Sequence, residues 1–231
     1  MKSRKATVKH AFTASLPVMA GYLVLGMGFG ILLHTAGYGW WWALLMSALI
    51  YAGSMQYVAI DLLAAGASLI TAALVTVTVN VRHIFYGLSM LSQYKDIGKR
   101  KPYLIFALTD ETFSLVCSPT LPENVNKRGY YLWVSLFNHL YWVAGSTVGG
   151  ILGSFLPFST EGIAFAMTAL FVVIFVEQWE KEKRHLPALT GLVISVACLL
   201  LFGSDKFLIP AMVAITVALC IEKRWEVTDG E

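Results

Sequence analysis

The sequence predicts an all-α polytopic integral membrane protein with about six full transmembrane helices and two re-entrant or interrupted helices. Apolar residues make up 57% of the 231 residues, and charged residues only 13%. The mean hydropathy of +0.67 is too high for an ordinary soluble domain. Long apolar stretches alternate with short basic clusters, a pattern typical of a chain that crosses a membrane several times.

Eight apolar stretches approach the roughly 20 residues that a helix needs to cross the hydrocarbon. They are 11–33, 40–65, 67–91, 103–119, 130–156, 161–178, 187–203 and 207–221. The first follows a basic segment without a small-residue cleavage site, so we expect it to stay as a span. We expect residues 1–10 to form a basic cytoplasmic N-terminus and residues 222–231 a cytoplasmic tail, within a single membrane domain, 1–231.

Five basic clusters separate these stretches, and the positive-inside rule favours the cytoplasmic side for all of them. They are Lys2/Arg4/Lys5/Lys9, Lys95/Lys99/Arg100/Lys101, Lys127/Arg128, Lys181/Lys183/Arg184 and Lys223/Arg224. Eight full crossings would put the second cluster outside. The conflict disappears if 40–65 is a re-entrant hairpin that turns near Gly53-Ser54, and if 103–119 turns back at Asp110-Glu111. Six spans plus these two segments are therefore our preferred topology, and seven or eight true spans are the alternative.

Broken helices at membrane depth need protein or water to satisfy their free backbone groups, so we expect the two breaks to face each other inside the bundle. Many secondary transporters hold substrate and coupling ion at such breaks. At the first break Gly53 supplies a flexible turn, Ser54 a hydroxyl and Gln56 an amide, which suit a substrate ammonium or carboxylate group. A plain small-residue helix contact is the alternative.

The motif Asn80-Val81-Arg82-His83 interrupts the apolar stretch 67–91. An arginine at the centre of a membrane helix costs about 2.5–3.5 kcal/mol, so we expect it to face the bundle interior and a partner. The guanidinium of Arg82 matches a substrate carboxylate in two-point geometry. A static ion pair with Asp110, Glu111 or Asp61 is the alternative.

Three residues are candidates for ion coupling. His83 titrates near neutral pH when unperturbed, and on a continuous helix it shares a polar face with Thr76, Asn80 and Gly87. It can equally be a hydrogen-bonded packing residue. Asp110 and Glu111 are adjacent carboxyl groups in an apolar setting, where both do not ionise easily. Their alternative role, with Thr109, is to form the capped first turn of a helix.

Two further features concern packing and placement. Gly21, Gly26, Gly28 and Gly30 in the first span are spaced for close packing against another helix, in this chain or in a partner subunit. Trp40-Trp41-Trp42 is typical of an aromatic anchor at the membrane interface.

Several function classes find no support in the sequence. The net charge is only +3 and the basic residues form no stripe, so we expect no nucleic-acid partner. Cys117, Cys198 and Cys220 stand apart in apolar segments, which favours small buried side chains over metal ligands or disulfides. The chain has no Gly-x-Ser-x-Gly nucleophile motif and no zinc motif. We therefore expect no catalytic residue, no metal and no cofactor.

Four segments of the chain are distinctive as a set. They are Ala11-Phe12 through Pro17 and Gly21, Tyr51-Ala52-Gly53-Ser54-Met55-Gln56-Tyr57, Asn80-Val81-Arg82-His83-Ile84-Phe85-Tyr86-Gly87 and Thr109-Asp110-Glu111-Thr112-Phe113. Together they resemble the AzlC family of branched-chain amino acid exporters. The resemblance implies a secondary transporter of the bacterial inner membrane that exports leucine, isoleucine, valine and methionine. It also implies a heteromeric complex with a small AzlD-type membrane subunit.

Beside this resemblance, the residues themselves allow a site for a zwitterion. The candidate substrate contacts are Gly53, Ser54, Gln56, Asn80, Arg82 and Tyr86. Arg82 would bind the carboxylate, and Asp110 or Glu111 the ammonium group or a coupling proton. Apolar walls from Phe85, Tyr86 and Phe113 would separate aliphatic side chains poorly, because one methylene is worth only about 1–3 kcal/mol.

Two other functions compete with amino acid export. The chain can be a structural subunit of a transport complex whose partner forms the path, although costly intramembrane charges argue against an inert scaffold. It can also be an intramembrane enzyme in which His83 and Asp110 or Glu111 perform acid–base chemistry. Transport by this chain is the function that we prefer.

Overall fold

The computed structural model describes residues 3–95, 97–117, 119–155 and 185–203, with single residues and runs of two or three residues elsewhere between 172 and 221. The chain divides into two compact units, Met1–Ala166 and Met167–Glu231. The described residues form helices joined by turns, and none of them forms a strand, which confirms the all-α class. Most of the predicted span 161–178, about a third of 207–221 and the tail 222–231 lie outside the described residues. The number of crossings and the single membrane domain stay predictions.

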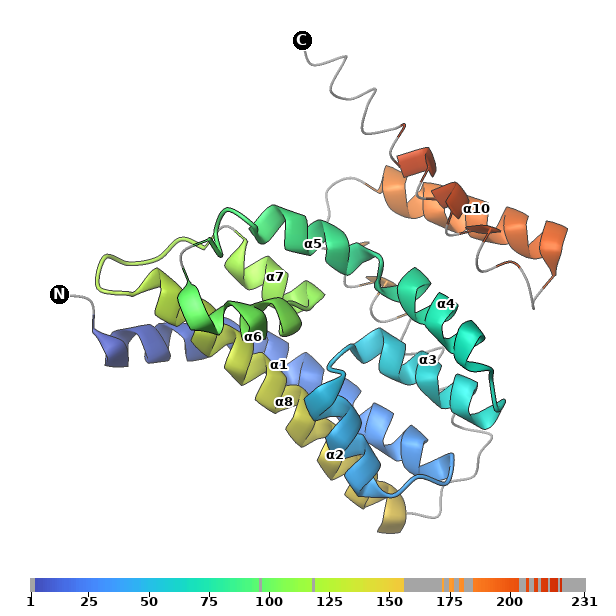
Figure 1. The fold of residues 1–231 in the computed structure, drawn as a ribbon, viewed down its shortest axis with the longest axis horizontal. Helices are drawn as coiled ribbons and strands as arrows, with labels where there is room; N and C mark the ends of the chain where they lie inside the picture. Colours follow the sequence, from blue (N-terminus) through green and yellow to red (C-terminus); the bar gives the residue numbers. More distant parts are fainter. Residues whose placement is uncertain are drawn as a thin grey trace. The chain divides into compact units, whose positions relative to one another are not determined.

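Figure 1 gives the helix labels used below. The first unit contains α1 (Arg4–Thr35), α2 (Trp40–Leu49), α3 (Gly53–Ala64), α4 (Leu69–Asn80), α5 (Arg82–Met90), the 3₁₀ turn η1 (Gly98–Arg100), α6 (Lys101–Phe106), α7 (Asp110–Val116) and α8 (Lys127–Phe155). The second unit contains α10 (Leu186–Phe202), which has a proline in its first turn and ends at Gly203, where φ is +72°. Proline at a helix start and glycine at its end are the usual arrangement.

Helix α1 has 32 residues and is therefore about 48 Å long at 1.5 Å per residue. Among the described residues, it is the one helix that is long and apolar enough by itself to cross a membrane. Ser3 caps its start by accepting a hydrogen bond from a backbone amide of the first turn. Gly26, Phe29, Gly30 and Leu33 are buried at the spacing of a single helix face. That face packs against α8.

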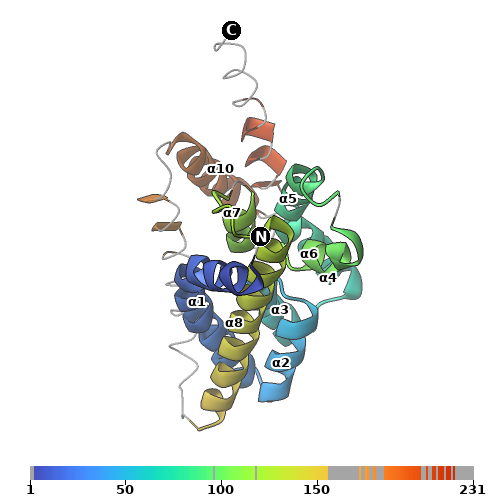
Figure 2. The ribbon, with the colours of Figure 1, turned by 90° about the vertical axis from the view of Figure 1, so that its left-hand side faces the viewer.

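Helices α1 and α8 run parallel and lie side by side (Figures 1 and 2). At one end the Thr7 hydroxyl accepts a hydrogen bond from the Asn126 amide, just before α8, at 3.0 Å. At the other end His34 lies directly against Gly153, close to the end of α8. The two helices therefore share one direction and one register over most of their length.

Backbone atoms of α1 and α8 lie directly against each other where the two helices cross. A Cβ atom on Gly30 would lie 2.1 Å from the Ser146 carbonyl oxygen, and one on Gly149 would lie 2.1 Å from the Met27 carbonyl oxygen. Such distances leave no room for a side chain, so glycine is required where the helices cross. This contact resembles the small-residue interfaces of membrane helices in general.

The four glycines predicted to pack closely have different surroundings. Gly26 and Gly30 face α8, and a Cβ on Gly28 would lie 3.0 Å from the Tyr57 hydroxyl of α3. Gly21 has no atom within 4 Å of such a Cβ. Close packing within this chain is therefore confirmed for three of the four positions, and for Gly21 the alternative of a partner subunit stays a prediction.

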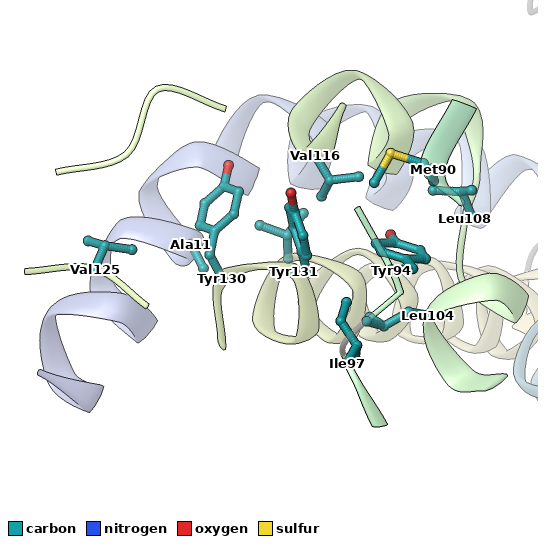
Figure 3. Close-up of a cluster of buried hydrophobic side chains, with 11 residues drawn as sticks. Ala11, Met90, Tyr94, Ile97, Leu104, Leu108, Val116, Val125, Tyr130 and Tyr131 are labelled. Carbon is teal, nitrogen blue, oxygen red and sulfur yellow. The ribbon is translucent and has the colours of Figure 1, made fainter. Parts of the chain in front are cut away.

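A cluster of buried hydrophobic side chains lies at one end of the first unit (Figure 3). Its members are Ala11, Met90, Tyr94, Ile97, Leu104, Leu108, Val116, Val125, Tyr130, Tyr131 and Val134. The cluster gathers residues of α1, α5, α6, α7 and the η1 region around the start of α8. The basic clusters at 4–9, 95–101 and 127–128 consequently lie at this end of the unit, which we call the basic end.

Helices α2 and α3 form the first hairpin. Helix α2 begins beside Gly150, far from the basic end, and Ser47 in its last turn lies against His139 in the middle of α8. Tyr57 of α3 then packs on Phe29, so the chain has turned back toward the end from which it came. The turn occupies residues 50–52, within three residues of the predicted Gly53-Ser54.

Tyr51 makes this turn possible. Its φ of +48° places it in the left-handed region, which side chains other than glycine rarely adopt. The residue is buried, and the next helix starts two residues later at Gly53. The strained backbone is therefore held in place by the packing of the tyrosine ring.

Helices α6 and α7 form the second hairpin, which enters from the basic end. The turn at residues 107–109 lies level with Tyr22, in the middle of α1, and the Tyr130 hydroxyl then donates to the Leu115 carbonyl oxygen near the end of α7 (3.2 Å). The break precedes the predicted position, because the Thr109 hydroxyl accepts from the Thr112 amide and caps α7. Asp110 and Glu111 thus form the first turn of α7, as their alternative interpretation predicted.

The stretch 67–91 is interrupted at Val81, between α4 and α5. The Ile84 amide bonds to the Val81 carbonyl oxygen instead of the Asn80 carbonyl, which the His83 ring approaches through Nδ1 at 3.2 Å. The break lies inside the Asn80-Val81-Arg82-His83 motif, so the continuous helix on which Thr76, Asn80, His83 and Gly87 would share one face does not form. No residue of α4 is buried within the part of the chain that the structure describes.

The backbone contact between α1 and α8 predicts the effect of added methyl groups. Gly149→Ala should destabilise the folded protein by about 3 kcal/mol or more, because the methyl group would meet the backbone of Met27 and the helices would have to separate. Thermal unfolding in detergent would measure this. Gly21→Ala is the matched control and should leave stability unchanged or raise it by about 0.5–1 kcal/mol, since its Cβ points into open space. Equal stability of both variants would contradict the contact.

Candidate functional site

The tips of the two hairpins meet in the middle of the first unit, beside α1 and α8. The Tyr51 ring at the first tip lies 6.1 Å from the Phe106 ring at the end of α6, between ring centroids. The same ring meets Tyr22 of α1 edge-on at 6.5 Å. We call the meeting point of residues 50–53 and 106–110 the hairpin junction.

One line of polar groups crosses the junction from α8 to α7. Asn138 Nδ2 donates to the Thr112 hydroxyl at 3.1 Å, and the Thr112 and Thr109 hydroxyl oxygens lie 3.0 Å apart. The Thr109 hydroxyl lies 2.7 Å from the Tyr22 hydroxyl, which donates to Glu111 Oε2 at 2.6 Å. We call this line the hydroxyl chain. It ends in a carboxyl group, and every neighbouring pair in it is within hydrogen-bond distance.

Two polar atoms beside the hydroxyl chain have no hydrogen-bond partner among the described residues. They are Asn138 Oδ1, on a side chain with 0% exposure, and the hydroxyl of buried Tyr51. Buried polar groups are nearly always paired, so unpaired ones indicate a position that water or a ligand can fill. The junction therefore has spare hydrogen-bonding capacity at its centre.

A second polar line runs from α8 to α2 through α3. The Trp142 indole donates to Gln56 Oε1 at 2.9 Å, and Gln56 Nε2 donates to the Ser47 hydroxyl at 3.1 Å. All three side chains are buried. The ring of Trp142 also covers Gly53, where a Cβ would lie 3.2 Å from the indole. These bonds hold the first hairpin against α8.

The predicted site residues fall into three places. Gly53, Ser54 and Gln56 lie in the first turn of α3 at the junction, and Asp110 and Glu111 lie in the first turn of α7. Asn80, Arg82, His83 and Tyr86 lie around the α4–α5 break. Tyr86 stacks on Phe113 of α7 at 4.8 Å, which connects the second and third places.

The α4–α5 break brings further polar atoms to this region. Asn80 Nδ2 donates to the Thr76 carbonyl oxygen at 3.0 Å, while its Oδ1 is buried without a partner among the described residues. His83 lies 5.8 Å from the Tyr86 ring. The Arg82 and Phe85 side chains lie outside the described part of the structure, so the predicted partners of Arg82 stay predictions.

Sequence reasoning did not select several residues that build the junction. They are Tyr22, Tyr51, Asn138, His139 and Trp142. One signal was available, since Asn138, His139 and Trp142 interrupt the apolar stretch 130–156 at helical spacing. Tyr22 carries no such signal, because a tyrosine in an apolar helix is ordinary.

The hairpin junction lies within the segment of the chain that matches a family model. The model of the family described as "AzlC protein" matches residues 17–156, which include both hairpins and α8. The chain belongs to the AzlC family. It is 48% identical to the branched-chain amino acid transport protein AzlC of Bacillus subtilis over 95% of this chain and 86% of that protein.

Other relatives in this family are membrane proteins from distant organisms. An uncharacterized membrane protein of Helicobacter pylori is 45% identical over 94% of this chain and 95% of its own length. The inner membrane protein YgaZ of Escherichia coli is 28% identical over 96% of this chain and 93% of its own. No solved structure matches the chain. Amino acid transport and membrane location therefore apply to this chain, as AzlC membership indicates.

The hydrogen bonds of Gln56 in the second polar line predict that replacing this side chain with an apolar one destabilises the folded protein. Gln56→Leu should destabilise the protein by about 2–4 kcal/mol, because Trp142 Nε1 and the Ser47 hydroxyl would both stay buried without a partner. Chemical unfolding in detergent would measure this. Thr76→Val is the matched control and should change stability little, since this exposed hydroxyl bonds to its own helix. Unchanged stability of the Gln56→Leu variant would show that these hydrogen bonds do not stabilise the protein.

Proposed function

We propose that this chain exports leucine, isoleucine, valine and methionine across the bacterial inner membrane, coupled to protons, as the large subunit of a complex with a small AzlD-type membrane protein. The observation that carries the proposal is the hairpin junction, where two broken helices entering from opposite ends meet at buried polar groups. Transporters hold substrate and coupling ion at such positions, because free backbone groups and helix ends are available there.

The hydroxyl chain supports proton coupling at Glu111. When Glu111 is ionised, the Tyr22 hydroxyl donates to it, and the Thr109 hydroxyl donates to Thr112. When Glu111 is protonated it can donate to Tyr22, and the Tyr22 hydroxyl can then turn to donate to Thr109. A proton on Glu111 therefore changes the direction of one hydroxyl in the chain.

We assign the substrate carboxylate to Arg82, at the start of α5, and the ammonium group to Asp110, at the start of α7. Gly53, Ser54 and Gln56 complete the polar contacts from α3. The stack of Tyr86 and Phe113 offers an apolar wall for an aliphatic side chain. Such a wall favours a broad specificity for aliphatic amino acids.

The arrangement of basic residues supports a topology with two re-entrant hairpins. The clusters at 4–9, 95–101 and 127–128 share the basic end, which requires an even number of crossings between them. With α2–α3 and α6–α7 as hairpins, α1 and the α4–α5 segment supply two crossings, and α8 begins where α1 begins. We propose that the basic end is cytoplasmic and that both termini are cytoplasmic.

Transport depends on Arg82 in this proposal. Leucine counterflow in proteoliposomes that contain the chain and its small partner should be robust in the wild type. Arg82→Leu should reduce it by about tenfold or more at normal abundance, as expected from loss of a charge-assisted contact worth over 1.4 kcal/mol. Lys9→Leu at the exposed start of α1 is the control and should retain counterflow. Full counterflow by Arg82→Leu would favour a structural subunit, and absence of exchange in the intact complex would remove the substrate assignment.

The topology is tested with single cysteines on a background in which Cys117, Cys198 and Cys220 are replaced by alanine. Lys99→Cys and Glu123→Cys should react with a membrane-impermeant maleimide from the same side, because both positions lie at the basic end. Ala67→Cys, in the turn after α3, should react from the other side. Labelling of positions 99 and 123 from opposite sides would favour seven or eight true spans instead.

A further inference from the structure

We propose that His139 on α8 is a second proton-binding group of the transport cycle, and that its proton controls the contact of the two hairpin tips with α8. This inference rests on the proposed function and adds a residue to its coupling machinery. His139 is half-buried and lies at the hairpin junction, where it contacts both hairpins and belongs to neither.

The two ring nitrogens of His139 have different partners. Nε2 lies 3.3 Å from the Ser47 carbonyl oxygen of α2, which can only accept, so Nε2 carries a proton in either state of the ring. Nδ1 lies 3.3 Å from the Tyr103 hydroxyl of α6. In the neutral ring Nδ1 accepts from Tyr103. In the protonated ring Nδ1 must donate, so the Tyr103 hydroxyl has to turn and find another acceptor.

Aromatic rings surround the imidazole on the remaining sides. The Tyr51 ring lies 4.3 Å away between centroids, tilted by 33°, and the Phe106 ring lies 5.6 Å away at an edge-on angle. An aromatic face favours a cation, so the Tyr51 ring offsets part of the cost of burying a protonated imidazole. Since Tyr51 and Phe106 are the two hairpin tips, a proton on His139 strengthens the contact of both tips with α8.

The titratable groups that face His139 are few. Tyr51 faces it from the first hairpin and Tyr103 from the second, while α1 and α7 present Tyr22 and Glu111 behind the Tyr51 ring. The described contacts of His139 include no lysine, arginine or carboxylate. Its charge thus depends on its burial, on the surrounding aromatic rings and on its hydrogen bonds to Ser47 and Tyr103.

The test compares the pH profile of leucine exchange with its rate at one pH. His139→Gln keeps an N–H near the Nε2 position for Ser47 but cannot be protonated. In the chain with its small partner in proteoliposomes, wild-type exchange should change by about threefold or more between pH 5.5 and 8, as one titrating histidine predicts. H139Q should exchange leucine at a fixed pH but lose most of this dependence and most of the accumulation driven by a pH gradient.

Two further variants complete the test. His10→Gln is the control, because it makes the same change in a histidine at the basic end, whose ring centroid lies 5.7 Å from that of Tyr130. This variant should keep the wild-type pH profile. Tyr103→Phe should move the profile toward lower pH by about half a unit to one unit, because hydrogen bonds to a charged ring are the stronger ones. This variant also decides the question if H139Q does not assemble.

The outcomes separate the two proposals. Wild-type exchange with a full pH dependence in H139Q, or with an unshifted profile in Tyr103→Phe, overturns the role of His139 and leaves the transport function intact. Absence of leucine exchange in the wild-type complex contradicts the proposed function and the role of His139 with it. Loss of gradient-driven accumulation in H139Q, with exchange retained, supports both.

Discussion

The backbone contact of α1 with α8 is the constraint on which the rest of the first unit depends. Because glycines remove the side chains at the crossing, the two helices lie close enough to fix their register along most of their length. That register places Tyr22 of α1 level with Asn138, His139 and Trp142 of α8. The polar side chains of both helices therefore reach the same depth, which neither helix could achieve alone.

Each hairpin then packs against α1 and α8 through residues at its tip. The first tip presents a strained tyrosine and the uncapped start of α3, and Trp142 and Gln56 hold it through buried hydrogen bonds. The second tip presents Thr109, whose hydroxyl both caps α7 and approaches Tyr22. The junction thus combines aromatic packing with polar bonds, and polar bonds have discrete alternatives when a proton binds. A packed apolar core would not offer such alternatives.

The sequence predicted the local features and missed the long-range ones. The hairpin turns near Gly53-Ser54 and Asp110-Glu111 were found within three residues, because polar and small residues interrupt apolar stretches there. The residues that contact those turns were not predicted. Tyr22, Tyr51 and His139 meet only through the register of helices that are distant in the chain. The exact break before α7 depended on a capping bond of Thr109, and sequence alone left that interpretation open. Family membership supports the transport function independently of these contacts.

The parallel pairing of α1 and α8 also has a consequence for biosynthesis. The ribosome completes α1 about 90 residues before it begins α8, an interval of roughly 5–20 seconds at ordinary translation rates. During that time the glycine face of α1 waits in the membrane without its partner, while both hairpins are made. The hydrogen bonds of both hairpins to Asn138, His139 and Trp142 can form only after this part of α8 has been made. A membrane insertase that shields α1 during this interval would protect the chain from pairing with the wrong helix.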